Sequence, residues 1–377
     1  MRRTAALIAG GGPAGAAVAI RLARGGVRPL LIERRHDSRD VVCGGFLGAD
    51  AIAGLASLGI DPMELGARPI RRVRIAAGER IAETSLPFAA AGLSRGALDA
   101  ALLARAAGEG AIIERGVSVR RVDREARRLT LGDGGAVAGG ALFLATGKHE
   151  LRGGRRAIAA ARDPAVGLRI GLAPSPRLAA ALEDVIELHL FRHGYAGLLL
   201  TEDGSVNLCL SIAQSRLKAA GGEATTLMAA LAQEAPLLAE RFGTAAGGGI
   251  WSSVARIPYG WRATQGEPGV FRLGDQSAVI ASLAGDGIAI ALASAAAAAQ
   301  YFLDGGASAS IAYQADFSRR VRRPIEIANA LRRWGERPAA AKPLVSLFSH
   351  LPSLVRHAAR STRTEPPIAG YVQRTRG

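Results

Sequence analysis

The sequence predicts a mixed α/β protein, α+β overall, in which a three-layer domain with a parallel sheet is joined to a domain with an antiparallel sheet. The first observation is a short apolar run, "TAALIAG" (4–10), followed by helix-forming residues at 14–24 and a second apolar run, "RPLLIER" (28–34). This order is typical of a β-α-β unit with buried parallel strands. The second observation is a strand-rich stretch at 164–213, and the third is a mainly helical sequence beyond residue 306.

Glycines at the start of the first predicted helix indicate a phosphate-binding loop. Gly10, Gly12 and Gly15 fit the pattern GxGxxG, with Pro13 and Ala14 between the second and third glycines. The first glycine permits a tight turn, the second lets the backbone approach a pyrophosphate, and the third allows the helix to pack closely on the strand. The loop therefore predicts a Rossmann-like nucleotide-binding domain.

A carboxylate at the end of the second predicted strand supports this interpretation. Glu33 lies 23 positions after Gly10, where an acid accepts hydrogen bonds from ribose hydroxyls. The same N-terminus, with Arg2 and Arg3 before small apolar residues, also resembles a secretory signal. A signal peptide requires neither the glycine spacing nor a following strand that ends in an acid, so we favour the nucleotide site.

Composition argues against several classes of function. The 377 residues carry a net charge of +16, but the basic residues are mostly scattered and aromatic residues make up only 5% of the chain. A base-stacking surface interleaves basic and aromatic residues, so we expect no nucleic-acid partner. Cys43 and Cys209 are too few for a disulfide framework, which favours a cytoplasmic location, and no clustered Cys and His spacing indicates a metal.

Residues 277–303 form a second apolar stretch whose length would span a bilayer. Asp286 lies in its middle between two glycines, and alanine dominates where leucine would be expected. A strand, a glycine loop and a buried helix explain this composition better. We therefore predict no transmembrane segment here.

Four motifs together resemble the FAD-dependent oxidoreductases of the aromatic-hydroxylase and geranylgeranyl-reductase superfamily. They are "GGGPAGAAVA…LLIER", "LSRGALDAAL", "LFLATG" and the late "FRLGDQSAVIASLAGDGIAIALASA". With the strand pattern, the resemblance implies a discontinuous FAD-binding domain at 1–163 plus 255–305, with residues about 62–92 a possible part of the substrate side. A substrate domain at 164–254 and a helical C-terminal region at 306–377 complete the expected organisation.

The resemblance also implies which residues contact FAD. In that superfamily the late aspartate, here Asp275, bonds the ribityl chain, and a glycine turn, here Gly285 and Gly287, brings a positive helix end to the flavin. An arginine on an early helix contacts the cofactor, and Arg95 matches it. The expected cofactor-binding set is Gly10, Gly12, Pro13, Ala14, Gly15, Glu33, Arg34, Cys43, Gly44, Arg95, Asp275, Gly285, Gly287 and Ile288.

Two flavin chemistries and one non-catalytic role stay open. A monooxygenase acting on a small apolar or aromatic molecule is the first choice, and a reductase of prenyl or other isolated double bonds is the alternative. Thr146-Gly147 replaces the Asp-Gly motif that many hydroxylases link to NADPH, and "GDGIAIALASA" is closer to the prenyl reductases. The tryptophan-rich motif and early lysine of flavin halogenases are missing, which disfavours halogenation. A non-catalytic FAD-binding protein is the third reading.

The sequence leaves the electron donor open. The sequence holds no second GxGxxG for a resident nicotinamide domain, so the donor is either NAD(P)H bound elsewhere or a partner reductase. The sequence does not predict an oligomeric state.

Four side chains are candidates for catalysis. Cys43 follows the second predicted strand and either touches the flavin or substrate or is a small buried apolar residue. His189, His193 and Tyr195 lie around "HLFRHGYAG" on the expected substrate sheet. Because His189 alternates with leucines, it is expected to face either the pocket or solvent.

The C-terminal sequence "PLVSLFSHLPSLVRHAAR" predicts an amphipathic helix. Leu344, Leu347, Phe348 and Leu351 fall on one helical stripe, followed by arginines. We expect this stripe to pack on the protein's own core, and contact with a membrane surface is the alternative.

Overall fold

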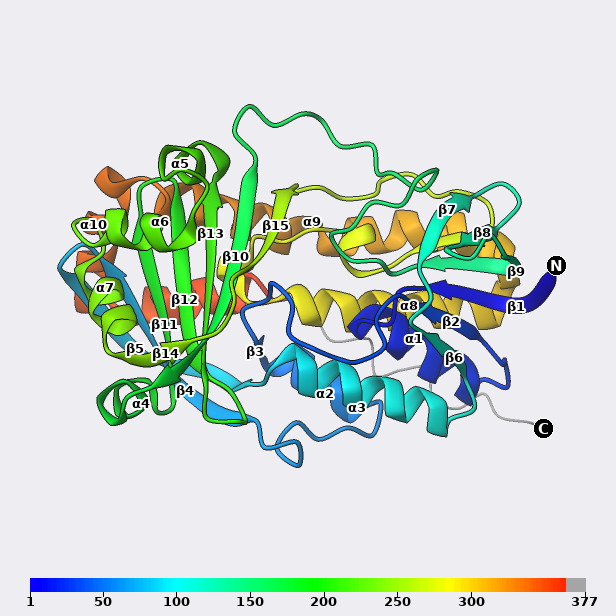
Figure 1. Cartoon of the computed structure of the whole chain (residues 1–377), viewed down its shortest axis with the longest axis horizontal. Helices are drawn as coiled ribbons and strands as arrows, with labels where there is room; N and C mark the ends of the chain where they lie inside the picture. The colour runs from blue at the N-terminus through cyan, green and yellow to red at the C-terminus, as the bar shows by residue number, and fades with distance from the viewer. Residues whose placement is uncertain (364–377) are drawn as a thin grey trace.

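The computed structural model describes residues 1–363, and these are built on two sheets that follow one another along the long axis of the molecule (Figure 1). The N-terminal sheet has the order β6-β2-β1-β9-β8-β7, with β16 paired to β9. Its parallel strands are β1 (Arg2–Ala9), β2 (Leu30–Glu33), β6 (Ile112–Arg115), β9 (Ala136–Leu144) and β16 (Val270–Arg272). The antiparallel strands β7 (Val119–Asp123) and β8 (Arg128–Leu131) extend it.

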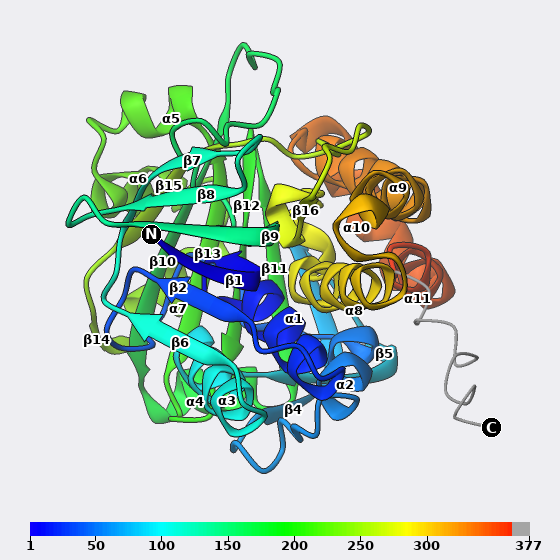
Figure 2. The same ribbon diagram turned by 90° about the vertical axis from the view of Figure 1, so that its right-hand side faces the viewer.

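Alternating side chains bury both faces of the N-terminal sheet. Ala6, Ile8 and Phe143 face a core shared with the helices α1 (Pro13–Arg24), α3 (Arg95–Gly108) and α8 (Gly287–Gly305). Leu7 and Leu142 face the opposite way and pack in a cluster with residues of β7 and β8. Figure 2 shows β7 and β8 next to β9 in this sheet, and α1 and α8 beside it. The expected three-layer arrangement is thus confirmed, because a parallel sheet must be covered on both faces.

The second sheet has the order β14-β10-β13-β12-β11-β4-β5-β3, with β15 paired to β10. Its strands are β3 (Phe46–Leu47), β4 (Arg68–Ala77), β5 (Arg80–Gly92), β10 (Ala165–Pro174), β11 (Val185–Phe191), β12 (Gly194–Leu200), β13 (Val206–Ala213), β14 (Ala245–Gly248) and β15 (Ser252–Ile257). All pairs are antiparallel as expected, except β11 with β4, which are parallel. Early residues from β4 and β5 therefore share this sheet with residues from the middle of the chain.

Short helices cover the outer face of the second sheet, and the C-terminal helices cover part of its inner face. The outer set is α4 (Pro176–Leu182), α5 (Gln214–Ala219), α6 (Ala224–Leu231) and α7 (Pro236–Gly243). On the inner side α10 (Pro338–His350) and α11 (Pro352–Ser361) pack against β4 and β5. The helix α9 (Ser310–Gly335) connects them to α8, and α2 (Ala49–Ala56) also packs on α8.

The predicted C-terminal stripe divides between two environments. Leu344 and Phe348 are buried or half-buried in a cluster with the second sheet, whereas Leu347 and Leu351 are exposed. The helix breaks at Leu351, because the following Pro352 disfavours helical backbone at the residue before it. The expected packing on the protein's own core is therefore confirmed for Leu344 and Phe348 and wrong for Leu347 and Leu351.

One stretch, Gly287–Gly335, is long and apolar enough to cross a membrane by length and composition, and half of its most apolar window is buried inside the protein. It includes α8, which packs on α1, α2 and α9. These contacts are those of a core helix.

Candidate functional site

A single continuous cavity of about 1000 Å³ runs from the glycine loop to the inner face of the second sheet. Its volume is at the upper end of the range for ligand pockets, ~300–1000 Å³. All residues of the expected cofactor set line it except Gly15, which packs behind the loop. They are Gly10, Gly12, Pro13, Ala14, Glu33, Arg34, Cys43, Gly44, Arg95, Asp275, Gly285, Gly287 and Ile288.

The glycine loop leaves no room for side chains. Gly10 has a φ of +104°, and a Cβ there would lie 2.5 Å from the carbonyl oxygen of Ala145. A Cβ on Gly15 would lie 1.8 Å from the carbonyl oxygen of Gly10. Gly12 is the N-cap residue that precedes α1, and no side chain among the described residues caps that helix end. The bare amides at the start of α1 therefore face the cavity as a site for an anion.

Glu33 is held beside this loop by two backbone amides. The amide of Gly11 donates to its Oε2 at 2.6 Å, and the amide of Arg35 donates to its Oε1 at 2.9 Å. Arg34, next in the chain, hydrogen-bonds His149 over 2.9 Å. The end of β2 thus presents a fixed carboxylate next to the helix end, with basic groups around it.

Arg95 begins α3 and reaches the glycine loop. Its guanidinium pairs with Asp99 through two hydrogen bonds of 2.9 and 2.7 Å, and lies beside Gly12. Burial alone would lower the pKa of Arg95, but the Asp99 carboxylate outweighs burial and raises it. The cavity therefore holds a permanent positive charge at this point.

Asp275 lies across the cavity, paired with a lysine that the sequence patterns did not indicate. The Nζ of Lys148 is 3.2 Å from its Oδ2, and Asp275 raises the pKa of that lysine. Arg156 donates to the carbonyl oxygen of Asp275 at 2.7 Å, which fixes the backbone here. The only sequence signal for Lys148 was its rarity, as one of three lysines in the chain.

The part of the cavity beneath the second sheet is apolar. We call it the apolar chamber, and its walls come from β4, β5, β11, β12 and the C-terminal helices. They are Val73, Ile75, Leu86, Ile186, Leu188, Leu190, Leu199, Leu331, Leu344, Phe348, Val355 and Ala359. None of these wall residues is charged, whereas charged side chains line the half of the cavity next to the glycine loop. Arg363, which follows α11, is a further charged residue that lines the cavity.

Three hydroxyl groups lie where the apolar chamber joins the glycine-loop half. Tyr195 and Tyr259 both hydrogen-bond the hydroxyl of Ser282, the latter over 2.7 Å. The amide of Leu283 donates to the Tyr195 hydroxyl at 3.0 Å. Burial raises the pKa of Tyr195 well above 10, so its phenol stays protonated. Tyr195 was an expected candidate; Tyr259 and Ser282 were not.

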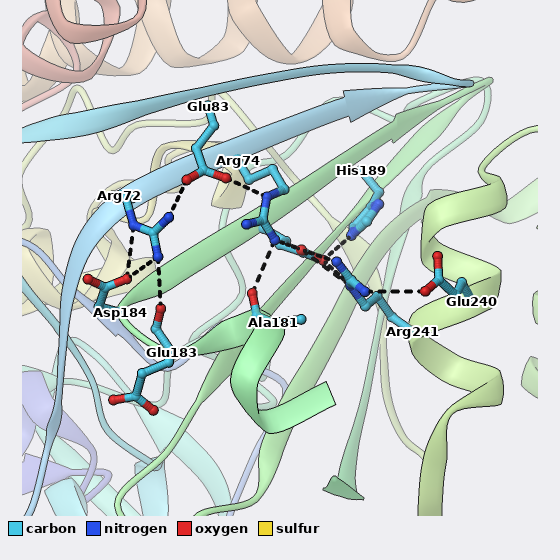
Figure 3. Close-up of polar contacts among 10 residues, drawn as sticks. Arg72, Arg74, Glu83, Ala181, Glu183, Asp184, His189, Glu240 and Arg241 are labelled. Atoms are coloured by element: carbon cyan, nitrogen blue, oxygen red, sulfur yellow. Dashed lines mark hydrogen bonds and ion pairs between the residues drawn. The ribbon is translucent and has the colours of Figure 1, made fainter. Parts of the chain in front are cut away.

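His189 faces neither the cavity nor solvent, contrary to both expected positions. On β11 the chamber-lining residues are Ile186, Leu188 and Leu190, so Glu187 and His189 point to the opposite face. There the fully buried Glu187 binds Arg74, Arg241 and His189. Figure 3 shows the side chains of these three partners pointing toward one another.

His193 is also remote from the cavity. It is exposed at the β11–β12 turn, with a φ of +58°. The structure therefore leaves Cys43 and Tyr195 as the expected catalytic candidates that line the cavity.

Both cysteines of the chain line the same wall. The side-chain amide of Asn207 donates to the carbonyl oxygen of Cys43 at 2.9 Å, and Cys209 lies two residues further along the same face of β13. Burial raises the pKa of the Cys209 thiol to about 12, so it stays a neutral thiol. Both cysteines are free.

Comparison with known families assigns the N-terminal third of the chain. Residues 3–130 match the family described as FAD binding domain. A chloroplastic geranylgeranyl diphosphate reductase from Oryza sativa subsp. japonica is 35% identical over 124 residues, which is 32% of this chain and 26% of that protein. A 3-hydroxybenzoate 6-hydroxylase from Klebsiella oxytoca is 44% identical over 55 residues, 15% of this chain and 14% of that protein. The similarity thus spans about a quarter or less of these relatives' length.

Solved structures resemble the whole chain. A geranylgeranyl bacteriochlorophyll reductase-like protein from Thermoplasma acidophilum superposes with a TM-score of 0.76 at 19% identity, covering 97% of this chain and 96% of that one. PqsL, a probable FAD-dependent monooxygenase from Pseudomonas aeruginosa, gives 0.71 at 18% identity, covering 92% and 100%. At these identities the likeness concerns the fold.

Proposed function

Because residues 3–130 form an FAD binding domain within the fold shared by flavin monooxygenases and geranylgeranyl reductase-like proteins, we propose that this protein is an FAD-dependent oxidoreductase. Its first assignment is a monooxygenase that acts on a small apolar or aromatic molecule. The observation that carries the proposal is the continuous cavity, which joins a charged, glycine-lined half to the apolar chamber.

The charged half fits FAD. Gly12 and the uncapped start of α1 would receive the pyrophosphate, and Glu33 the ribose hydroxyls. Arg95 would add a positive charge near the phosphates, and Asp275 with Lys148 would line the middle of the cofactor. Gly285 and Gly287 place the start of α8 at the cavity, where its positive end favours added negative charge. Bound FAD would supply two-electron chemistry, with either oxygen or a carbon–carbon double bond as acceptor.

The apolar chamber defines the substrate class. Its uncharged walls favour a molecule without a net charge in that part, since burying an unpaired charge is costly. The hydroxyls of Tyr195, Ser282 and Tyr259 would orient one polar group of that molecule at the boundary with the cofactor. PqsL, which shares the fold, has been solved with the small aromatic compound 2-aminobenzoylacetate.

A reductase of isolated double bonds is the second candidate. The apolar chamber would suit a prenyl chain, and the Oryza relative is a geranylgeranyl diphosphate reductase. The electron donor in either case would be NAD(P)H or a partner reductase. We place the protein in the cytoplasm, because its two cysteines are free.

Oxygen dependence separates the candidates. The purified protein should be yellow or become yellow when FAD is added. In the experiment, the flavin is reduced and its reoxidation is followed with and without oxygen, in the presence of substrates of each class. Product that requires oxygen supports the monooxygenase, whereas anaerobic reduction of a double bond supports the reductase. FAD binding without turnover of either class would favour a non-catalytic protein, and failure to bind FAD would overturn the proposal.

Replacing Tyr195 tests the role of the hydroxyl group. Tyr195→Phe removes the hydrogen bonds to Ser282 and to the Leu283 amide and leaves the ring. We expect FAD binding to persist and turnover to fall about tenfold or more, because the variant lacks a hydroxyl that would orient the polar group of the substrate. Tyr301→Phe is the matched control, since its hydroxyl binds Asp316 outside the cavity. Equal activity of the two variants would contradict the role.

A further inference from the structure

Arg363, beyond the end of α11, enters the cavity from the C-terminal region. Its guanidinium forms an ion pair with Asp286, the residue that precedes α8. The same guanidinium lies 4.1 Å from the ring centre of Phe88 and 5.8 Å from that of Phe46. Arg363 therefore links the end of α11 to α8, β3 and β5 at one corner of the cavity.

Asp286 is a buried acidic residue at the start of α8. It is fully buried between Gly285 and Gly287, and its Oδ2 has no hydrogen-bond partner among the described residues. A carboxylate here would oppose the positive end of the 19-residue α8. Burial, together with Asp50, raises the pKa of Asp286, to about 7, while Arg363 acts to lower it. Arg363 is thus the group that compensates this carboxylate.

We propose that Arg363 is a positioning residue of the cofactor site, which cancels the charge of Asp286 and so leaves the positive end of α8 to act on the flavin. This inference rests on the proposed function, because it assumes that FAD occupies the cavity. It gives the residue that follows α11 a part in setting the reduction potential of the flavin. Without the arginine, the buried carboxylate would either oppose added electrons or take up a proton.

A charge cycle tests the inference. At pH 8, above the pKa of about 7 of Asp286, Asp286→Asn leaves Arg363 as an uncompensated cation and should raise the midpoint potential of bound FAD. We expect at least a tenfold shift toward the reduced form at a fixed potential, which is ~30 mV for a two-electron couple. The double variant Asp286→Asn, Arg363→Gln removes both charges and should return the potential to the wild-type value. Arg363→Lys keeps the charge and should also leave it unchanged.

A matched control separates charge from general damage. Asp123→Asn removes a carboxylate paired with Arg128 outside the cavity and should not move the potential. If Asp286→Asn binds FAD with the wild-type potential, or if the single and double variants shift it equally, the inference fails and the proposed function stands. If the wild-type protein does not bind FAD, both fail. If the variants of Arg363 do not fold, Asp286→Asn alone tests the inference, since this variant must still raise the midpoint potential of bound FAD.

Discussion

At the scale of single residues, we expect Gly15 to be needed for stability and Gly12 for FAD binding, and substitutions can separate these two roles. A Cβ on Gly15 would lie 1.8 Å from a backbone oxygen, whereas on Gly12 it would meet only a guanidinium nitrogen of Arg95 at 3.3 Å. We therefore expect Gly15→Ala to lower the free energy of unfolding by about 3 kcal/mol or more. Gly12→Ala should fold, yet weaken FAD binding about tenfold or more, because its methyl group faces the cavity.

Flavin fluorescence quenching and thermal unfolding measure these two effects. Gly108→Ala is the control, because nothing lies within 4 Å of its Cβ position at the end of α3. It should leave both FAD affinity and stability near wild type. If Gly12→Ala binds FAD with wild-type affinity, the cofactor does not approach the protein backbone at this glycine.

Residues of the cavity differ in how far the sequence could predict them. The glycine loop and Glu33 are local, since a β-α-β unit fixes them within about thirty residues. The contacts of Tyr195 with Ser282 and of Arg363 with Asp286 join positions 87 and 77 residues apart. No periodicity or motif connects such positions, so only the fold reveals them. For His189, the alternation with leucines correctly indicated that it lies on the face opposite to them. That pattern cannot tell a solvent-exposed face from one that is buried against a charged cluster, here Glu187 with Arg74 and Arg241.

At the scale of elements, α7 is attached to the second sheet through one buried carboxylate. Glu187 on β11 accepts hydrogen bonds from Arg241 on α7 and from Arg74 on β4, beside His189 (Figure 3). Burial alone would raise the pKa of Glu187, but His189 and Arg241 outweigh burial and lower it to about 2. The ionised form is therefore the one that joins the two elements.

We expect Glu187→Gln to lower the free energy of unfolding at pH 7 by about 3 kcal/mol, since it removes the buried negative charge that Arg74 and Arg241 share. Each arginine then keeps only a more exposed carboxylate, Glu83 or Glu240. The pKa of Glu187 is lower in the folded than in the unfolded protein, so its contribution is present above pH ~4.5 and is lost as the pH falls toward 2. The gap between variant and wild type should close over that window in urea unfolding. Glu240→Gln is the control, because that exposed carboxylate reaches the same Arg241. A gap independent of pH would contradict this account.

Elements were predictable where local pattern decides them. The parallel core, the outer helices and the hairpin of β12 and β13 follow from apolar runs and turn residues. The parallel pairing of β11 with β4 does not, since those strands are more than 100 residues apart. The exposure of Leu347 and Leu351 also depends on where α10 docks. Tertiary packing decides both.

At the scale of the whole molecule, two sheets line one cavity, and we assign them different roles that a substitution should separate. Gly197 on β12 lines the cavity, and a Cβ there would find Leu188 at 3.6 Å, an ordinary contact. Gly197→Phe should therefore fold and fill part of the apolar chamber. The charged half, formed largely by the N-terminal sheet and its loops, should be unaffected.

The uncharged dye Nile red, whose fluorescence rises in apolar surroundings, can report on the chamber, and flavin fluorescence on the other half. In Gly197→Phe we expect the affinity for Nile red to fall about tenfold or more, because each 1.4 kcal/mol of apolar contact that the new ring blocks weakens binding about tenfold. The FAD dissociation constant should stay within about twofold of wild type. Gly243→Phe adds the same ring at the exposed end of α7, on the outer side of the second sheet, and should change neither constant. Joint loss of both ligands in Gly197→Phe would mean that the second sheet also holds the cofactor, and the division of the cavity between the two sheets would have to be abandoned.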